Sequence, residues 1–204
     1  NPVLGGISPG PHTLELVVSS NNGCTSTPVY KKFLIKPAPV ITATAANGCV
    51  DVPVLFTAQQ QDNATTITNW NWHLDNEEKS TEQNPTATYS SPGFYNINVT
   101  ATGDNGCDSN PETIRLFINK AEANAGNDTV IIQNQPFQLQ ASGGVSYSWT
   151  PAIGLTSQSF PNPIVLLQDD ATYTLSVRTI EGCEDEDVIH IKIFRGSGIR
   201  VPTA

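Results

Sequence analysis

Short runs in which apolar and polar residues alternate recur along this chain, and they predict an all-β protein. The alternation is plain in Tyr95-Asn-Ile-Asn-Val-Thr-Ala and in Ile189-His-Ile-Lys-Ile, where every second side chain would face a core. No segment carries a convincing helical period. We expect strands at 12–19, 29–36, 40–45, 52–58, 66–74, 86–89, 94–102, 112–119, 128–132, 136–141, 145–149, 163–167, 171–179 and 187–194.

One alternating phrase occurs three times, beginning at the aligned residues His12, Tyr95 and Tyr173 and ending each time in Gly-Cys. Its cysteines are 83 and then 76 residues apart, which indicates a string of small sandwich domains. Two strands cannot fold alone, so the rest of the first domain is expected to precede Asn1. The expected parts are the end of a first Ig-like domain (1–37), two further domains (38–119 and 120–196) and a linker (197–204).

The composition fits such β domains and excludes several kinds of partner. Of the 204 residues, 38% are hydrophobic and 14% are charged, a balance that suits strands with polar outer faces. The net charge of −9 argues against nucleic acid and anionic membranes as partners. Apolar runs stay well below the roughly 18 residues that a membrane span needs, so we expect no membrane insertion. The chain opens on Asn1 without a signal peptide, and we expect it to be an internal fragment of an exported protein.

Two stretches resemble known repeat families. The run Trp72-His-Leu-Asp, then Asn84-Pro85, Tyr89 and Ser91-Pro-Gly-Phe-Tyr95, resembles the signature of PKD (polycystic-kidney-disease-like) domains, although Asn76-Glu-Glu-Lys replaces that family's Gly-Asp-Gly turn. The third repeat resembles a sister type found in surface proteins of Bacteroidota. Its matching motifs are Ala125-Gly-Asn-Asp-Thr129, Tyr147-Ser-Trp149, Asn162-Pro163 and Thr172-Tyr173.

The last residues resemble the opening of a sorting domain. Val201-Pro-Thr-Ala204 is similar to the start of the gliding-motility-associated C-terminal domain. Together these resemblances imply a large protein that is exported by the type IX secretion system and displayed outside the cell, on the outer-membrane surface. The partners they imply are the type IX machinery, other cell-envelope proteins and surface polysaccharide.

Two functions compete. The preferred one is a non-enzymatic stalk of tandem sandwiches in a secreted adhesin linked to gliding or adhesion. The alternative is a carbohydrate-binding accessory region of a secreted enzyme that degrades polysaccharide or protein. Nucleophilic catalysis would need a Ser or Cys beside a positioned His, and the three histidines occupy equivalent or exposed β positions, so no triad can be assembled.

The aromatic residues are expected to be mostly structural. By the resemblance, Trp72 and Trp149 hold the family's core position. Tyr95 and Tyr173 lie near the start of a penultimate strand, as in the tyrosine corner of sandwich folds. Trp70 shares a face with Trp72 and is the candidate for a platform on which a sugar stacks.

Three further sites are candidates on weaker patterns. The acidic loop with Asp75, Glu77 and Glu78 could hold Ca²⁺, the only cofactor considered, but a solvated turn is favoured because the loop lacks a regular ladder of oxygens. The cluster Glu181 and Glu184–Asp187 is interpreted as a charged hairpin tip that blunts edge pairing. Asp128-Thr129-Val130 resembles the O-glycosylation signal of Bacteroidota, which makes Thr129 a candidate acceptor.

The four cysteines lack zinc-site spacing and allow two disulfide pairings. Cys49–Cys107 would lie within the second domain, but sandwich topology puts these residues at opposite ends, roughly 20 Å apart, whereas a disulfide needs Cα atoms about 5.5 Å apart. The same topology brings Cys49 to the junction where Cys183 lies. We therefore predict a Cys49–Cys183 bridge, with Cys24 and Cys107 paired to cysteines upstream of Asn1. Reduced thiols are the alternative left open.

Overall fold

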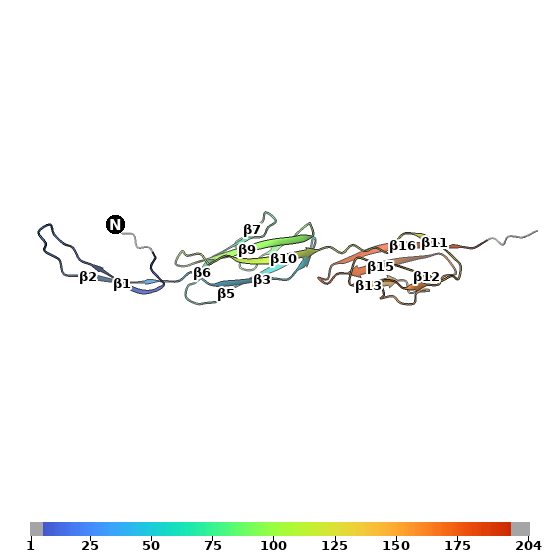
Figure 1. Ribbon diagram of the computed structural model, residues 1–204, viewed down its shortest axis with the longest axis horizontal. Coiled ribbons are helices and arrows are strands. Elements are labelled where there is room, and N and C mark those ends of the chain that lie inside the picture. The colour runs from blue at the N-terminus through green and yellow to red at the C-terminus, as the bar shows by residue number, and fades with distance from the viewer. Residues whose placement is uncertain (1–5, 197–204) are drawn as a thin grey trace, which may run out of the picture. The chain divides into compact units, whose positions relative to one another are not determined.

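The computed structural model describes residues 6–196, and these form strands and no helix (Figure 1). The prediction of an all-β chain of tandem β-sandwiches is confirmed. Within the described range, no helix is long and apolar enough to cross a bilayer. The chain divides into two compact units. The first unit comprises Asn1–Ala46, Leu55–Ala87 and Tyr95–Arg115, and the second comprises Asn47–Val54, Thr88–Phe94 and Leu116–Ala204.

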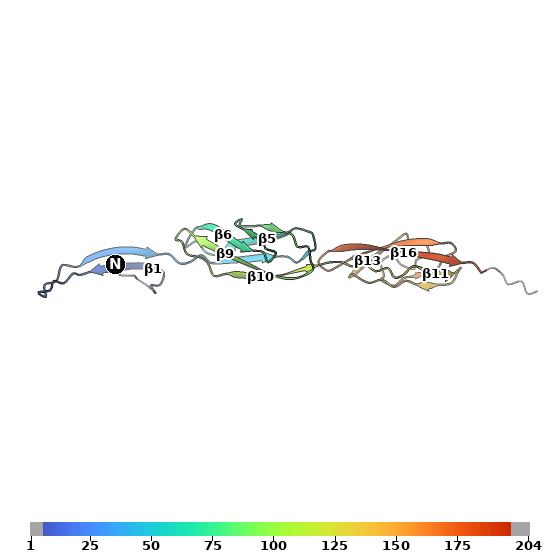
Figure 2. The same cartoon turned by 90° about the horizontal axis from the view of Figure 1, so that it is seen from above.

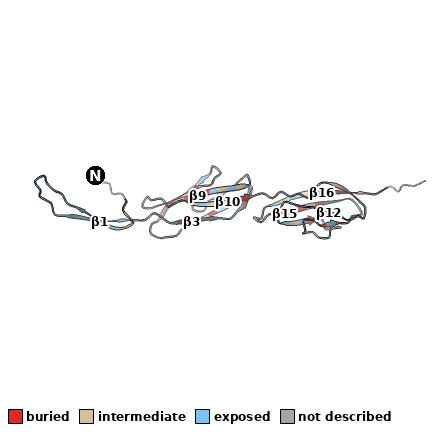
Figure 3. Cartoon of the chain, viewed as in Figure 1, coloured by how far each residue is buried: buried red, intermediate tan, exposed pale blue. Residues whose placement is uncertain are grey.

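The first unit begins with an antiparallel hairpin of β1 (Gly10–Leu16) and β2 (Val29–Ile35). The register pairs His12 with Phe33 and Leu16 with Val29, so these four side chains share one face of the hairpin. Leu16 and Val29 are exposed and His12 and Phe33 are half-buried, and most of β1 is coloured as exposed in Figure 3.

Two sheets follow the hairpin. One has the strand order β3 (Ile41–Ala45), β5 (Val54–Gln60), β8 (Thr86–Ala87). The other has the order β4 (Gly48–Cys49), β10 (Glu112–Asn119), β9 (Gly93–Gly103), β6 (Ile67–His73), β7 (Lys79–Ser80).

The two sheets pack face to face. The Phe56 ring of β5 lies 5.6 Å from the Trp72 ring of β6, measured between ring centroids, and both residues are fully buried. Burial alternates along β9, where Ile97 and Val99 are buried and their neighbours are not. The period-2 pattern of the sequence is therefore the pattern of this core.

The second unit contains a four-stranded sheet in the order β11 (Thr129–Ile132), β16 (Glu184–Phe194), β15 (Ala171–Arg178), β13 (Ser146–Thr150). A two-stranded sheet is formed by β12 (Phe137–Gln138) and β14 (Ile164–Val165). Trp149, Tyr173, Leu175 and Val165 join these sheets in one core. Figure 2 shows β11 beside β16, with which it pairs in parallel.

Every expected strand has a counterpart, with ends that differ by a few residues. The strands β4 and β7 were not predicted, because their residues lie outside any alternating run of apolar and polar positions. The domain boundaries at 37/38 and 119/120 stay a prediction, since the compact units are not simple consecutive segments of the chain. The predicted sorting-domain motif at 201–204 and the predicted linker at 197–204 lie outside the described residues.

Candidate functional site

The three Gly-Cys phrases fold into the same hairpin. In each, the N–H of the first hairpin residue donates to the carbonyl of the cysteine, at 2.8 Å in Ser20–Cys24, 2.9 Å in Gly103–Cys107 and 2.9 Å in Thr179–Cys183. The glycine N–H then donates back to the carbonyl of the first residue. This is a type I turn followed by a left-handed residue.

The left-handed residue explains why glycine precedes each cysteine. Gly23, Gly106 and Gly182 have φ values of 82°, 75° and 89°, a region that residues with a Cβ enter only at a cost. The repeated phrase is thus the signature of a turn that delivers a cysteine to the same place on each hairpin.

The predicted disulfide between Cys49 and Cys183 is present, with Cα atoms 5.5 Å apart. Cys49 lies in β4, which pairs in parallel with the end of β10 so that Cys49 is opposite Asn119. The sulfur of Cys183 lies 3.6 Å from the Asn119 carbonyl oxygen, and Cys183 is buried. Both cysteines belong to the second unit. Cys24 and Cys107 are exposed free thiols.

Carboxylates of β16 hold the segment that leads from β10 to β11. The N–H of Ala123 donates to Asp185 Oδ2 and the N–H of Ala125 donates to Asp187 Oδ2, both at 2.8 Å. Asp128 Oδ1 then accepts the N–H of His190 at 2.9 Å, one residue before the β11–β16 ladder begins. Side-chain oxygens therefore replace a backbone ladder along this segment.

The acids Glu181 and Glu184–Asp187 were interpreted as a charged hairpin tip, and the structure adds a bonding partner for each of them, while Glu184 and Glu186 remain exposed. Glu181 accepts the side-chain amide of Asn119 at 2.6 Å, and this hydrogen bond lowers the pKa of Glu181. Glu184 pairs with Arg178, and Glu186 accepts the hydroxyl of Ser176 at 2.7 Å. Asp185 and Asp187 bind backbone N–H groups, so all five acids have a partner.

The hairpin at 103–107 binds the segment that directly follows β2 in the first unit. Lys36 Nζ lies 2.7 Å from Asp104 Oδ2, and the Asn105 amide donates to the Pro37 carbonyl at 2.8 Å. The hydrogen bonds from Lys36 and from the Thr65 hydroxyl lower the pKa of Asp104 to about 2. In both units, therefore, a Gly-Cys hairpin bonds to the residues at the end of an earlier strand. That strand is β2 in the first unit and β10 in the second.

The expected core tryptophans are fully buried and satisfied. Trp72 Nε1 donates to the Glu82 carbonyl at 2.9 Å, and Trp149 Nε1 donates to the Phe160 carbonyl at 3.0 Å. These matching bonds, which start from equivalent strands, support the assignment of both residues as core.

The two tyrosines are not equivalent. Tyr173 is fully buried, its hydroxyl donates to the Ile153 carbonyl, and burial raises its pKa. Tyr95 is half-buried. Counted back from the shared cysteine, Tyr173 occupies the position of Ile97 rather than that of Tyr95 or His12, because the third phrase is two residues shorter. The acceptor of Tyr173 also lies 20 residues upstream, farther than in a tyrosine corner.

The proposal of Trp70 as a sugar platform is wrong. Only 8% of Trp70 is exposed, which leaves no open ring face for stacking. The physical reason is the strand period, which places Trp70 and Trp72 on the same inward face of β6.

The acidic loop does not assemble as a metal site. Asp75 Oδ2 accepts the N–H of Asn96 at 2.7 Å, and Asp75 and Glu77 have left-handed φ values of 58° and 69°. Across residues 6–196, no group of three or more His, Cys, Asp or Glu side chains is placed to hold a metal ion. Thr129 is half-buried at the start of β11, and its glycosylation stays a prediction.

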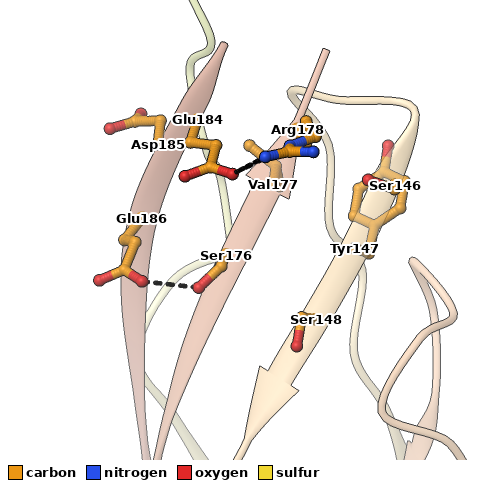
Figure 4. Close-up of a pocket in the computed structure, with 9 residues that line it drawn as sticks. All are labelled: Ser146, Tyr147, Ser148, Ser176, Val177, Arg178, Glu184, Asp185 and Glu186. Carbon is orange, nitrogen blue, oxygen red and sulfur yellow. Dashed lines mark hydrogen bonds and ion pairs between the residues drawn. The ribbon is translucent and has the colours of Figure 1, made fainter. Parts of the chain in front are cut away.

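A polar groove lies on the outer side of the sheet of the second unit (Figure 4). Strands β13, β15 and β16 line it, and Figure 4 shows the Arg178–Glu184 and Ser176–Glu186 pairs within it. Three serines add hydroxyl groups, and the lining contains no histidine: Ser146, Tyr147, Ser148, Ser176, Val177, Arg178, Glu184, Asp185 and Glu186. The arrangement offers hydrogen bonds to a polar ligand but no nucleophile with a base.

Sequence reasoning missed the residues that fix the linker segments. Asp185 and Asp187 alternate on β16, so a same-face pair of acids beside a Gly-Cys hairpin was visible as a signal. Lys36, Asp104 and Asn105 gave no such signal, because their contact joins residues far apart in the sequence.

One family model matches part of the chain. The PKD domain family model matches residues 36–118, which supports a PKD-like domain over that segment. None of the curated proteins matches the chain.

Three solved PKD domains resemble part of the chain. The PKD domain of an M14-like peptidase from a Thermoplasmatales archaeon is 13% identical, with a TM-score of 0.37, over 42% of this chain and 100% of its own. The PKD1 domain of Vibrio anguillarum Epp is 21% identical, with a TM-score of 0.37, over 42% of this chain and 100% of its own. The PKD1 domain of the Vibrio cholerae metalloprotease PrtV is 27% identical over 40% and 99%, with a TM-score of 0.34. At these scores the likenesses carry no argument about function.

Proposed function

We propose that this chain is a non-enzymatic stalk in which β-sandwich modules are joined by covalent and hydrogen-bonded junctions. One observation carries the proposal: the disulfide joins Cys49, inside the segment that matches the PKD domain, to Cys183, outside it. PKD domains are in general non-catalytic accessory modules. A bridge at a junction restricts the hinge motion that short linkers otherwise permit, which is what a spacer requires.

The setting proposed for this stalk is the outer surface of a bacterial cell. The disulfide fits an oxidising compartment, and the sequence resemblances favour a large adhesin exported by the type IX system and linked to gliding or adhesion. Its proposed partners are the secretion machinery, other envelope proteins and surface polysaccharide. The proposal includes neither nucleic acid nor membrane insertion.

Small-angle scattering of the chain tests the stalk. We compare the oxidised protein with the Cys49→Ser/Cys183→Ser double variant, and we use Cys107→Ser as the matched control because Cys107 is an exposed free thiol. The expected result is a narrower distribution of interatomic distances for the oxidised protein and for the control. Identical distributions for all three proteins would show that the bridge does not rigidify the chain and would contradict the proposal.

A second function is favoured by the polar groove of the second unit. Its hydroxyl groups, carboxylates and Arg178 match the groups that orient a sugar through its own hydroxyls, so a carbohydrate-binding accessory role is the alternative. Calorimetric titration with soluble polysaccharides tests it. Binding that Arg178→Ala abolishes and Arg195→Ala preserves would favour the accessory role over the stalk.

A further inference from the structure

The β1–β2 hairpin repeats the β9–β10 pair down to individual hydrogen bonds, at a shift of 83 residues. The N–H of Ser26 donates to the Val18 carbonyl at 2.8 Å, and the N–H of Ser109 donates to the Ala101 carbonyl at 2.8 Å. The Ser26 and Ser109 hydroxyls accept the N–H groups of Val18 and Ala101, both at 3.0 Å. Such agreement identifies β1–β2 as the closing strand pair of a sandwich of the same kind.

The face of the β1–β2 pair that corresponds to the buried face of β9–β10 is exposed to solvent. Leu14, Leu16 and Val18 are 41%, 57% and 60% exposed. Their equivalents Ile97, Val99 and Ala101 are 0%, 1% and 0% exposed. The β9–β10 pair belongs to a two-layered sandwich whose opposing sheet contains β5. The repeat thus tells what covers such a face: a second β layer with inward apolar side chains.

The position of Cys107 adds a second, independent observation. The same 83-residue shift makes Lys36 the equivalent of Asn119. Cys49 pairs with Asn119 in a parallel register. The hairpin whose Glu181 accepts the Asn119 amide also carries Cys183, which is bonded to Cys49. The hairpin whose Asp104 pairs with Lys36 carries Cys107 at the position equivalent to Cys183, and Cys107 is an exposed thiol.

We propose that the face formed by Leu14, Leu16, Val18, Phe33 and Ile35 binds a β layer that precedes Asn1 in the natural polypeptide. This layer includes a short strand in parallel register with Lys36, and that strand carries a cysteine that forms a disulfide with Cys107. The two thiols give up two protons and two electrons to an exchanging disulfide such as glutathione disulfide, which is reduced to two thiols. The inference rests on the tandem architecture of the proposed stalk and adds a second bridged junction to it.

Disulfide mapping of a longer natural polypeptide tests the bridge. The protein is extended N-terminally by the length of one domain, roughly 100 residues, oxidised with glutathione disulfide and digested without reduction. We expect the Cys107 peptide to be linked to a peptide from before Asn1. Cys24→Ser, the matched control, leaves that link intact, whereas Cys107→Ser removes it. A free Cys107, a Cys24–Cys107 link or a Cys107 link between two copies overturns the proposal.

Hydrogen exchange tests the covered face separately from the cysteines. In the extended protein, Leu16→Asp is expected to abolish the protection of the β1–β2 amides, while Leu34→Asp, on the opposite face and already 65% exposed, leaves it unchanged. In the 204-residue chain neither variant has an effect. Unchanged protection in the extended Leu16→Asp protein overturns the proposal. So does a dimer of the 204-residue chain that Leu16→Asp dissociates, because the layer would then come from a second copy. Neither readout depends on the stiffness that the scattering experiment measures.

Discussion

Glycine before the cysteine is the residue that lets the Gly-Cys turn form without backbone strain. Gly106 has φ 75°, and a Cβ added there would meet no atom within 4 Å beyond the adjoining residues, so a larger residue meets no clash and loses only conformational energy. We expect Gly106→Ala to lower the free energy of unfolding by about 1–2 kcal/mol. Urea denaturation measures it. Gly106→Asn is the matched variant and should lose less, because asparagine enters the left-handed region more readily; an equal loss would contradict this explanation.

The Asp104 carboxylate is a second prediction at the residue scale. Its pKa is lowered to about 2 mainly by the hydrogen bonds from Lys36 and Thr65. The folded pKa lies below the ordinary pKa of an aspartate. The contact therefore stabilises the fold at pH values above the ordinary pKa, and this stabilisation is lost as the pH falls towards 2. A carboxyl-carbon NMR titration should show the Asp104 midpoint near 2, and Lys36→Ala should raise it. An unmoved midpoint in that variant would refute the role of Lys36.

At the scale of elements, the docking of residues 123–128 on β16 depends on carboxylates rather than on a ladder. Asp185→Ala removes the acceptor of the Ala123 N–H, and hydrogen bonds to charged groups contribute about 1.5–3 kcal/mol. We expect a loss of about 1–2 kcal/mol, since Asp185 is half-buried. Hydrogen exchange should show faster exchange at Ala123.

The control for this experiment is Asp169→Ala, which removes an exposed partner of Arg195 and should change stability by less than about 1 kcal/mol. Asp185→Asn keeps an acceptor oxygen and should fall between the two. If Asp185→Ala behaves like the control, the carboxylate does not hold the linker segment.

The sequence predicted the strands well because half-buried strands carry their period in the residues themselves, as in Ile97, Val99 and Ala101. It could not predict β4 or β7, whose existence depends on which strand lies alongside. The same limit applies to the site. The Cys49–Cys183 pairing could be predicted from sandwich topology. The hydrogen bonds of the Ala123 and Ala125 N–H groups could not, because they depend on the path of a segment whose sequence has no hydrophobic pattern. Trp70 was misassigned although its strand position already placed it inward.

At the scale of the whole molecule, the bridge closes a loop between residues separated by 134 positions. Loops of that length restrict the unfolded chain strongly, and a native disulfide typically contributes about 2–5 kcal/mol. Cys183→Ser should therefore lower the thermal unfolding midpoint measured without reductant, whereas Cys107→Ser, which alters an exposed free thiol of this chain, should leave it unchanged. Dithiothreitol should lower the midpoint of the unsubstituted protein to that of Cys183→Ser and should have no further effect on the variant. If Cys183→Ser unfolds at the same midpoint as the unsubstituted protein, the Cys49–Cys183 bridge does not stabilise the chain.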